Sequence, residues 1–176
     1  AGGNGNKQGL YDLNARRWLT PQAWDEVKSH DGFFIASDYE YIEKGLRGDY
    51  VRQSLLDPAG KVLATGSGVS ILDKADRATV KDGKGNISLI DLQGRVLFSH
   101  RGDIINGYPQ INAYWVLSFP PDCGCKVLGI VSEQGETILP MQYGHLQVEG
   151  ERLKLWMPGM KTAVWFDVEQ VKNWRD

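Results

Sequence analysis

Two ten-residue stretches of this chain share six identical positions and one pattern, and their repetition restricts the folds available to it. The stretch SLLDPAGKVL at residues 54–63 returns as SLIDLQGRVL at residues 88–97. Three weaker copies are LYDLNARRWL at 10–19, GIVSEQGETIL at 129–139 and VWFDVEQVKNW at 164–174. In each copy, apolar residues flank a short segment that begins with Asp or Ser, which is the pattern of two strands joined by a tight turn.

The residues inside the repeated stretches favour hairpin turns. The first turn residue is Asp or Ser in every copy: Asp12, Asp57, Asp91, Ser132 and Asp167. Such a side chain can accept a hydrogen bond from the backbone N–H two residues further on. Three copies carry glycine three residues after it, at Gly60, Gly94 and Gly135. A hairpin with a type I turn needs a positive φ there. The first and last copies have Ala15 and Gln170 instead, so we expect those hairpins to be weaker or differently closed.

Further short strands are predicted between the hairpins. The candidate segments are residues 32–36, 50–56, 69–72, 78–81, 113–119, 152–157 and 163–167. They predict an all-β protein made of tandem β-hairpin repeats in a propeller-like or solenoid-like array. Residues 1–9 are polar and Gly-rich, so we expect a flexible N-terminal segment ahead of a single domain over residues 10–176.

Two of the hairpins are followed by a proline and, three residues later, by an aromatic residue. These pairs are Pro21 with Trp24 and Pro140 with Tyr143. Proline should end the strand because it cannot donate to the ladder, and the aromatic ring should then enter the core. Thr20 before Pro21 could also cap one helical turn, so the prediction allows at most one or two short helical turns.

In these features the chain resembles the WG-repeat family, bacterial proteins built from tandem β-hairpin units. The stretch GIVSEQGETILPMQYGHLQVEGERLKLW at 129–156 matches that pattern best, and the second and third units match only in their hairpins. The Trp-Gly or Tyr-Gly element of the family is degenerate here, with Leu128-Gly129 in its place. The resemblance implies a binding module and brings no catalytic residues.

The composition is that of a soluble globular protein. Hydrophobic residues make up 41% of the chain and charged residues 24%, and 20 Lys and Arg are balanced by 22 Asp and Glu. Because no basic stripe interrupts this balance, the sequence carries no electrostatic footprint for nucleic acid. The longest apolar run, Ala113–Phe119, is too short to span a bilayer. We expect a protein that does not bind nucleic acid and is not embedded in a membrane.

The first residues of the chain give an indication of where in the cell the protein resides. The chain starts AGGNGNKQG, without an initiator Met. Cleavage of a signal peptide after a small residue would leave such a start, and so would trimming of a longer protein. The first explanation predicts a periplasmic or exported protein, and the second leaves a cytoplasmic location open.

The sequence offers little evidence of catalytic or metal-binding motifs. The sequence lacks a Gly-x-Ser-x-Gly elbow, a His-Glu-x-x-His motif and a phosphate-binding glycine loop, so we predict no enzymatic activity and no cofactor. Cys123 and Cys125 form a free or bridged loop pair without chemistry, a redox pair, or half of a metal site. A zinc site needs four ligands, and His30, His100 and His145 stand singly, so we predict no metal.

Residues 101–125 depart from the repeat pattern and are rich in aromatic side chains. Asn106–Pro109 is predicted to be a loop with Tyr108 at its tip, and Tyr114 and Trp115 follow in an apolar run. Aromatic residues on loops commonly form contact surfaces. We therefore predict that Tyr108, Tyr114 and Trp115 bind a partner, with irregular packing as the alternative.

The C-terminal strands carry two further tryptophans. Alternation in RLKLWM at 152–157 and AVWFD at 163–167 places Trp156 and Trp165 on the more polar faces of their strands. Trp156 is therefore added to the predicted binding residues, with packing between sheets as the alternative.

Together these features predict a non-catalytic protein-binding module, and an immunity protein that neutralises a secreted toxin is the narrower hypothesis. The alternative function is binding of envelope glycan or peptidoglycan.

Overall fold

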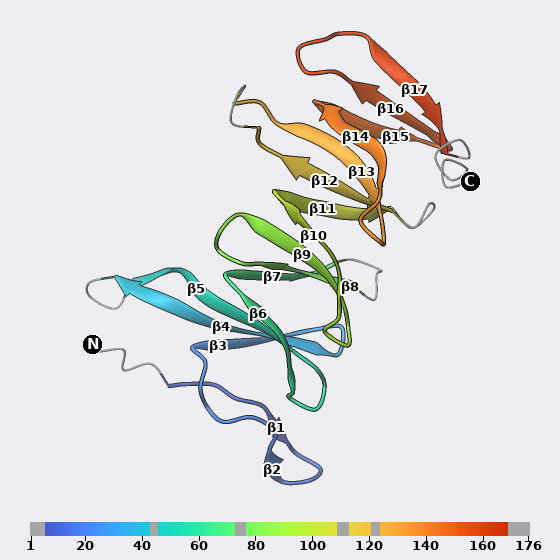
Figure 1. The fold of residues 1–176 in the computed structure, drawn as a ribbon. Helices are drawn as coiled ribbons and strands as arrows, with labels where there is room; N and C mark the ends of the chain where they lie inside the picture. The colour runs from blue at the N-terminus through green and yellow to red at the C-terminus, as the bar shows by residue number, and fades with distance from the viewer. Residues whose placement is uncertain (1–5, 43–45, 73–76, 109–112, 121–123, 169–176) are drawn as a thin grey trace. The chain divides into compact units, whose positions relative to one another are not determined.

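The chain is built from β-strands. The computed structural model describes residues 6–42, 46–72, 77–108, 113–120 and 124–168. Within these residues the regular elements are seventeen strands (Figure 1): β1 (Tyr11–Asp12), β2 (Arg17–Trp18), β3 (Glu26–His30), β4 (Phe33–Ile42), β5 (Leu46–Leu56), β6 (Val62–Gly66), β7 (Gly68–Ile71), β8 (Arg77–Lys81), β9 (Asn86–Asp91), β10 (Val96–Arg101), β11 (Asp103–Tyr108), β12 (Ala113–Ser118), β13 (Val127–Ser132), β14 (Thr137–Tyr143), β15 (His145–Glu149), β16 (Arg152–Trp156) and β17 (Ala163–Asp167). The all-β prediction is confirmed for this part of the chain. The helical turn allowed at Thr20–Pro21 does not form, and Trp24 makes a β-bridge with Gln8 just beyond it.

The strands form small sheets in which neighbours in sequence are neighbours in space. Three sheets have four strands, ordered β3-β4-β5-β6, β10-β9-β8-β7 and β11-β12-β13-β14. Two more sheets have the orders β15-β16-β17 and β1-β2. In each four-stranded sheet the repeated hairpin joins the third strand to the fourth, so the sequence repeat corresponds to a repeat of whole sheets.

The hairpin turns have the predicted chemistry. The Asp57 carboxylate accepts hydrogen bonds from the backbone N–H groups of Ala59 (2.9 Å) and Lys61 (2.8 Å). Asp91 and Ser132 make the equivalent pair of bonds in their own turns. The three turn glycines have φ of 82°, 85° and 83°, at Gly60, Gly94 and Gly135. This left-handed backbone lets each third strand turn directly into the fourth.

The first hairpin closes differently, as its missing glycine predicts. Asp12 accepts hydrogen bonds from the N–H groups of Asn14 and Ala15, both at 2.9 Å. The positive φ falls one residue later, on Arg16 at 53°. The resulting strands, β1 and β2, are two residues long. In the last copy, Asp167 ends β17, and Gln170 lies outside the described residues.

The chain divides into two compact units. The first contains residues 1–71, 77–84 and 90–95, and the second contains 72–76, 85–89 and 96–176. In the first unit, Leu56 on β5 packs with Ala36 and Trp24. Its neighbour Leu55 points to the other face of the sheet and packs with Val69 and Ala78. The β4–β5 pair is therefore buried on both faces, as expected for stacked sheets.

The second unit repeats this arrangement around β12 and β13. On one face of that pair, Val116 and Val131 belong to a cluster with Leu89. On the other face, Ile130 belongs to a cluster with Leu153 and a larger set of residues from β14 to β16. Every β13 residue is buried, because apolar clusters pack on both faces of the strand. These stacked sheets agree with a repeat array, and the choice between propeller-like and solenoid-like closure stays a hypothesis.

The prediction for the proline–aromatic pairs is confirmed for the aromatic residues and wrong for Pro140. Trp24 and Tyr143 both enter hydrophobic clusters, as predicted. Pro140, however, does not end its strand, because β14 continues to Tyr143. The register against β13 shifts between the pairs Ile130↔Leu139 and Leu128↔Tyr143. A bulge therefore accommodates the proline, which has no N–H for a regular ladder position.

Candidate functional site

The aromatic residues predicted to form a loop surface lie on paired strands. Asn106 and Tyr108 belong to β11, which extends over Asp103–Tyr108 and pairs with β12. The predicted loop at Asn106–Pro109 is therefore wrong as far as Tyr108, because the segment forms the first strand of a sheet. Tyr108 pairs with Ala113, and its side chain lies outside what the structure describes, so its binding role stays a prediction.

The structure places Tyr114 and Trp115 in or against the interior. Tyr114 is 4% exposed and packs near Phe98, with 6.1 Å between ring centroids. Trp115 points to the opposite face of β12 and is half-buried against the large cluster of the second unit. Because β12 is covered by packed residues on both faces, its apolar side chains contribute to packing. Neither ring offers a broad surface to a partner.

Trp156, the fourth predicted residue, lies on a face that the described residues leave open. In the sheet β15–β17, Leu146, Leu153 and Leu155 point into the core. The alternate positions point the other way and form what we call the terminal face: His145, Gln147, Glu149, Arg152, Lys154, Trp156, Ala163, Trp165 and Asp167. Their side chains are exposed or half-buried, and no other described sheet covers them. The terminal face is the candidate site.

Lys154 stands at the centre of the terminal face. Its ammonium nitrogen lies 4.8 Å from the ring centroid of Trp165 and 5.1 Å from that of Trp156. Trp165 is directly opposite Lys154 in the β16–β17 register. A cation over an aromatic face is attracted by the ring quadrupole, so Lys154 favours the observed positions of both indoles.

Four charged side chains of the terminal face form two pairs. Arg152 contacts Asp167 at 3.2 Å, and Lys154 lies 3.7 Å from Glu149. Exposed pairs of this kind contribute little to stability. They do neutralise the charge of the face, which lowers the cost of removing water from it when a partner binds.

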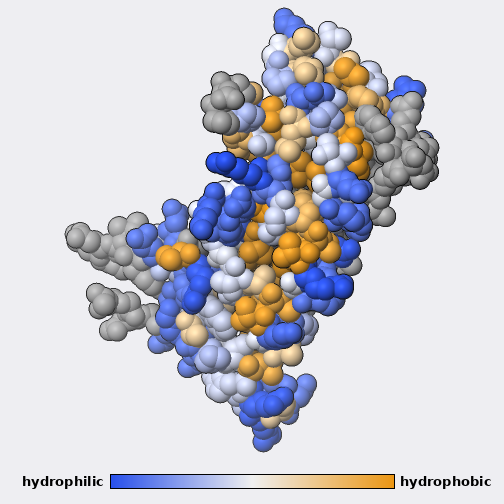
Figure 2. Space-filling model, in the orientation of Figure 1, coloured by the Kyte–Doolittle hydropathy of each residue, from blue (hydrophilic) through white to orange (hydrophobic). Residues whose placement is uncertain are grey.

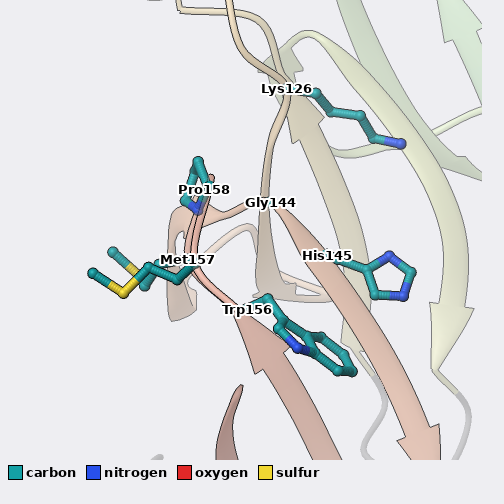
Figure 3. A pocket seen from close by; sticks show the side chains of 8 residues that line it. Lys126, Gly144, His145, Trp156, Met157 and Pro158 are labelled. Atoms are coloured by element: carbon teal, nitrogen blue, oxygen red, sulfur yellow. The ribbon is translucent and has the colours of Figure 1, made fainter. Parts of the chain in front are cut away.

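A shallow pocket adjoins one edge of the terminal face. It has a volume of about 440 Å³ and is lined by Lys126, Gly144, His145, Trp156, Met157, Pro158, Gly159 and Met160. Figure 3 shows the His145 imidazole beside the Trp156 indole, and their ring centroids are 5.1 Å apart. The lining combines an aromatic ring, thioethers and one lysine, and these groups suit contact with an apolar side chain.

The described residues hold no group arranged for metal binding. Within these segments, no three His, Cys, Asp or Glu side chains come together as a possible metal site. Cys125 is disulfide-bonded, and the only other cysteine of the sequence, Cys123, lies outside the described residues. In the same residues, no helix is long and apolar enough to cross a membrane.

Sequence reasoning placed Trp165 on a polar strand face but did not include Trp165 or Lys154 among the predicted binding residues, although a further signal was present. Trp165 lies two residues before the turn residue Asp167, and the corresponding residues in the earlier hairpins are apolar. Counting back from the turn would have identified Trp165 as a residue of the stacking face. Figure 2 shows both hydrophobic and hydrophilic residues on the face of the molecule that it draws.

Comparison with known proteins identifies no family. No family model and no curated protein matches the chain. Among solved structures, the chain is similar to BamB from Moraxella catarrhalis, with 16% sequence identity and a TM-score of 0.38. The match covers 84% of this chain and 44% of the BamB chain, so the chain spans less than half the length of that protein.

Proposed function

We propose that this chain is a non-catalytic protein-binding module and that the terminal face is its binding surface. One observation carries the proposal. Trp165 occupies a position that is completely buried at Leu55, Leu89 and Ile130 in the earlier repeats, yet Trp165 is 45% exposed. An indole at a stacking position without a described covering sheet marks a surface suited to burial against another protein.

The side chains around Trp165 support this proposal. Tryptophan and arginine are among the residues that dominate the energy of protein interfaces, and the terminal face carries both. Lys154 favours the observed positions of the two indoles, which reduces the conformational entropy lost when they bind. A face built on three paired strands is also more rigid than a loop surface. The resemblance to the WG-repeat family, a hypothesis that no family model supports, points to the same class of function.

Glycan binding is the second candidate, and one observation weighs against it. Sugar rings stack on bare aromatic faces, whereas the Lys154 ammonium occupies a face of both indoles. The paired carboxylates and Gln147 could still bond hydroxyl groups. Retention of the protein on purified cell-wall material, with loss of retention in Trp165→Ser, would favour this alternative.

The test compares two variants that each replace an exposed apolar side chain with serine. Trp165→Ser removes the indole that lies opposite Lys154 on the terminal face, and Val62→Ser removes a side chain of similar exposure on β6. The wild-type protein is immobilised in host extract, the captured partner is purified, and its affinity is measured by calorimetry. We expect Trp165→Ser to weaken binding at least tenfold and Val62→Ser to leave it unchanged. Equal affinity for all three proteins would reject the terminal face as the site.

The narrower hypothesis, neutralisation of a secreted toxin, needs a separate test. If the partner is a secreted toxin, adding wild-type protein should abolish the activity of the toxin, and Trp165→Ser should do so only at a higher concentration. A partner whose activity is unaffected would reject neutralisation and leave the binding function in place.

A further inference from the structure

The sheets inside each compact unit stack by a positional rule. The residue two places before the turn residue packs forward onto the following sheet, and the residue one place before it packs backward onto the preceding sheet. The forward residue of one repeat and the backward residue of the next therefore belong to the same hydrophobic cluster. This holds for Leu55 with Ile90, for Leu89 with Val131, and for Ile130 with Phe166.

Among the described residues, the first and last repeats each present an aromatic residue at one of these positions that no described sheet covers. In the last repeat the forward residue is Trp165, on the terminal face. In the first repeat the backward residue is Tyr11, which is 44% exposed, whereas Leu56, Ile90 and Val131 at this position are buried. Tyr11 is paired across the strands with Trp18, which is 51% exposed, and their rings meet edge to face at 5.2 Å. We call Tyr11 and Trp18 the first face.

We propose that the terminal face of one copy of this chain binds the first face of a second copy, head to tail. This inference rests on the proposed function, because it takes the terminal face as a protein-binding surface and names the partner. The contact would place Trp165 against Tyr11 in the relationship that Leu55 has with Ile90. The three junctions Leu55–Ile90, Leu89–Val131 and Ile130–Phe166 each join a forward residue to a backward one, which is why the partner surface is the first face and not a second terminal face.

The chemistry of the two faces is compatible. Both carry two aromatic rings, and the charges of the terminal face are already paired within it. Beside Trp18 lies a pocket of about 380 Å³, lined by the apolar residues Leu10, Val27 and Phe34 and by the polar residues Lys7, Gln8, Gln22 and Ser29. This mixed pocket offers room at the rim of the contact for an aromatic side chain with a polar edge, such as an indole.

Such a contact is heterologous, and its assembly behaviour follows from that. Each copy has one first face and one terminal face, so an added copy leaves one of each available. Assembly then continues until it closes into a ring or extends as a filament. A same-face contact would stop at a dimer instead.

The experiment mixes two variants that each lack one half of the contact. Trp165→Lys disables the terminal face, and Tyr11→Lys disables the first face. Light scattering after gel filtration should show the mass of the wild-type protein rising with concentration, and each variant alone should stay monomeric. An equimolar mixture should form dimers and nothing larger, because it contains one intact pair of faces. Circular dichroism checks that both variants are folded.

Three outcomes would overturn the inference. The first is a wild-type protein that stays monomeric at every concentration, and the second is an assembly that Tyr11→Lys does not affect. The third is a mixture of folded variants that forms no dimer. A monomeric wild-type protein that still captures another protein through Trp165 would reject this inference and retain the proposed function.

Discussion

Trp165 and Ile130 occupy the same position in consecutive repeats, two residues before the turn, and only Ile130 is covered by a following sheet. Ile130 is fully buried beside Leu153, whereas Trp165 is 45% exposed and lies against Lys154. The same place in the repeat therefore serves packing in one sheet and presents a surface in the next.

This difference predicts unequal costs for the same substitution. Ile130→Ala should lower the free energy of unfolding by about 3 kcal/mol, because it removes buried methyl groups and leaves a cavity. Trp165→Ala should lower it by less than about 1 kcal/mol, since it removes an exposed ring and one cation–π contact. Denaturant unfolding of the two variants measures both values. A loss at Trp165 as large as that at Ile130 would mean that the indole is structural.

The turn glycines should tolerate substitution according to the space beside them. Gly94 and Gly32 have almost the same backbone, with φ of 85° and 83°. A Cβ at Gly94 would lie 2.7 Å from the carbonyl oxygen of Leu63, whereas a Cβ at Gly32 would meet nothing within 4 Å. Gly32→Ala should therefore cost about 1 kcal/mol from backbone strain alone, and Gly94→Ala should cost at least about 1 kcal/mol more. Thermal unfolding compares them, and equal losses would show that the contact with Leu63 is unimportant.

Acid should destabilise the third hairpin through Asp91. Burial raises the pKa of this carboxyl group, but hydrogen bonds from Arg95 and Gln93 and the Arg95 charge outweigh burial and lower the pKa below its usual value. The unfolded chain then binds a proton more readily than the folded one, so the stabilisation is complete above the unfolded pKa of about 3.9 and is lost as the pH falls through the lower folded value.

The check for Asp91 is a comparison of acid unfolding curves. Asp91→Asn should be less stable than the wild type at pH 7, and the difference should shrink as the pH falls below about 4. Arg95→Gln should show a smaller loss of the same kind, because the backbone hydrogen bonds remain. A difference that does not depend on pH would contradict a lowered pKa.

The disulfide of Cys125 should contribute little to stability. If its partner is Cys123, the other cysteine of the sequence, the closed ring contains three residues. The loop-entropy relation then gives roughly 1.6 kcal/mol at most. Thiol titration should find no free thiol before reduction and two after it, and the melting temperature should change by only a few degrees. Tightly bound zinc in the oxidised protein would contradict this assignment.

The hairpin turns could be predicted from the sequence because their chemistry is local. Asp57 bonds to N–H groups within four residues of it, and Gly60 needs a conformation that its own backbone permits. The strands followed from the same logic, since alternation and β-branched residues act over a few positions. The prediction failed at Pro140 because a bulge opposite β13 decides whether that strand ends. The residues near Pro140 in sequence do not predict the bulge.

The sequence by itself determined which residues form hairpins and which positions of each hairpin are apolar. Only the tertiary structure decided which apolar positions are buried. Tyr114 was predicted to be a contact residue and is covered by a neighbouring sheet, whereas Trp165 was left out of the predicted binding residues and is exposed. The physical reason is that both faces of a stacked sheet carry apolar residues, and exposure depends on whether another sheet lies against a face. That depends on contacts between residues far apart in the chain, and a pattern of neighbours in sequence does not contain it.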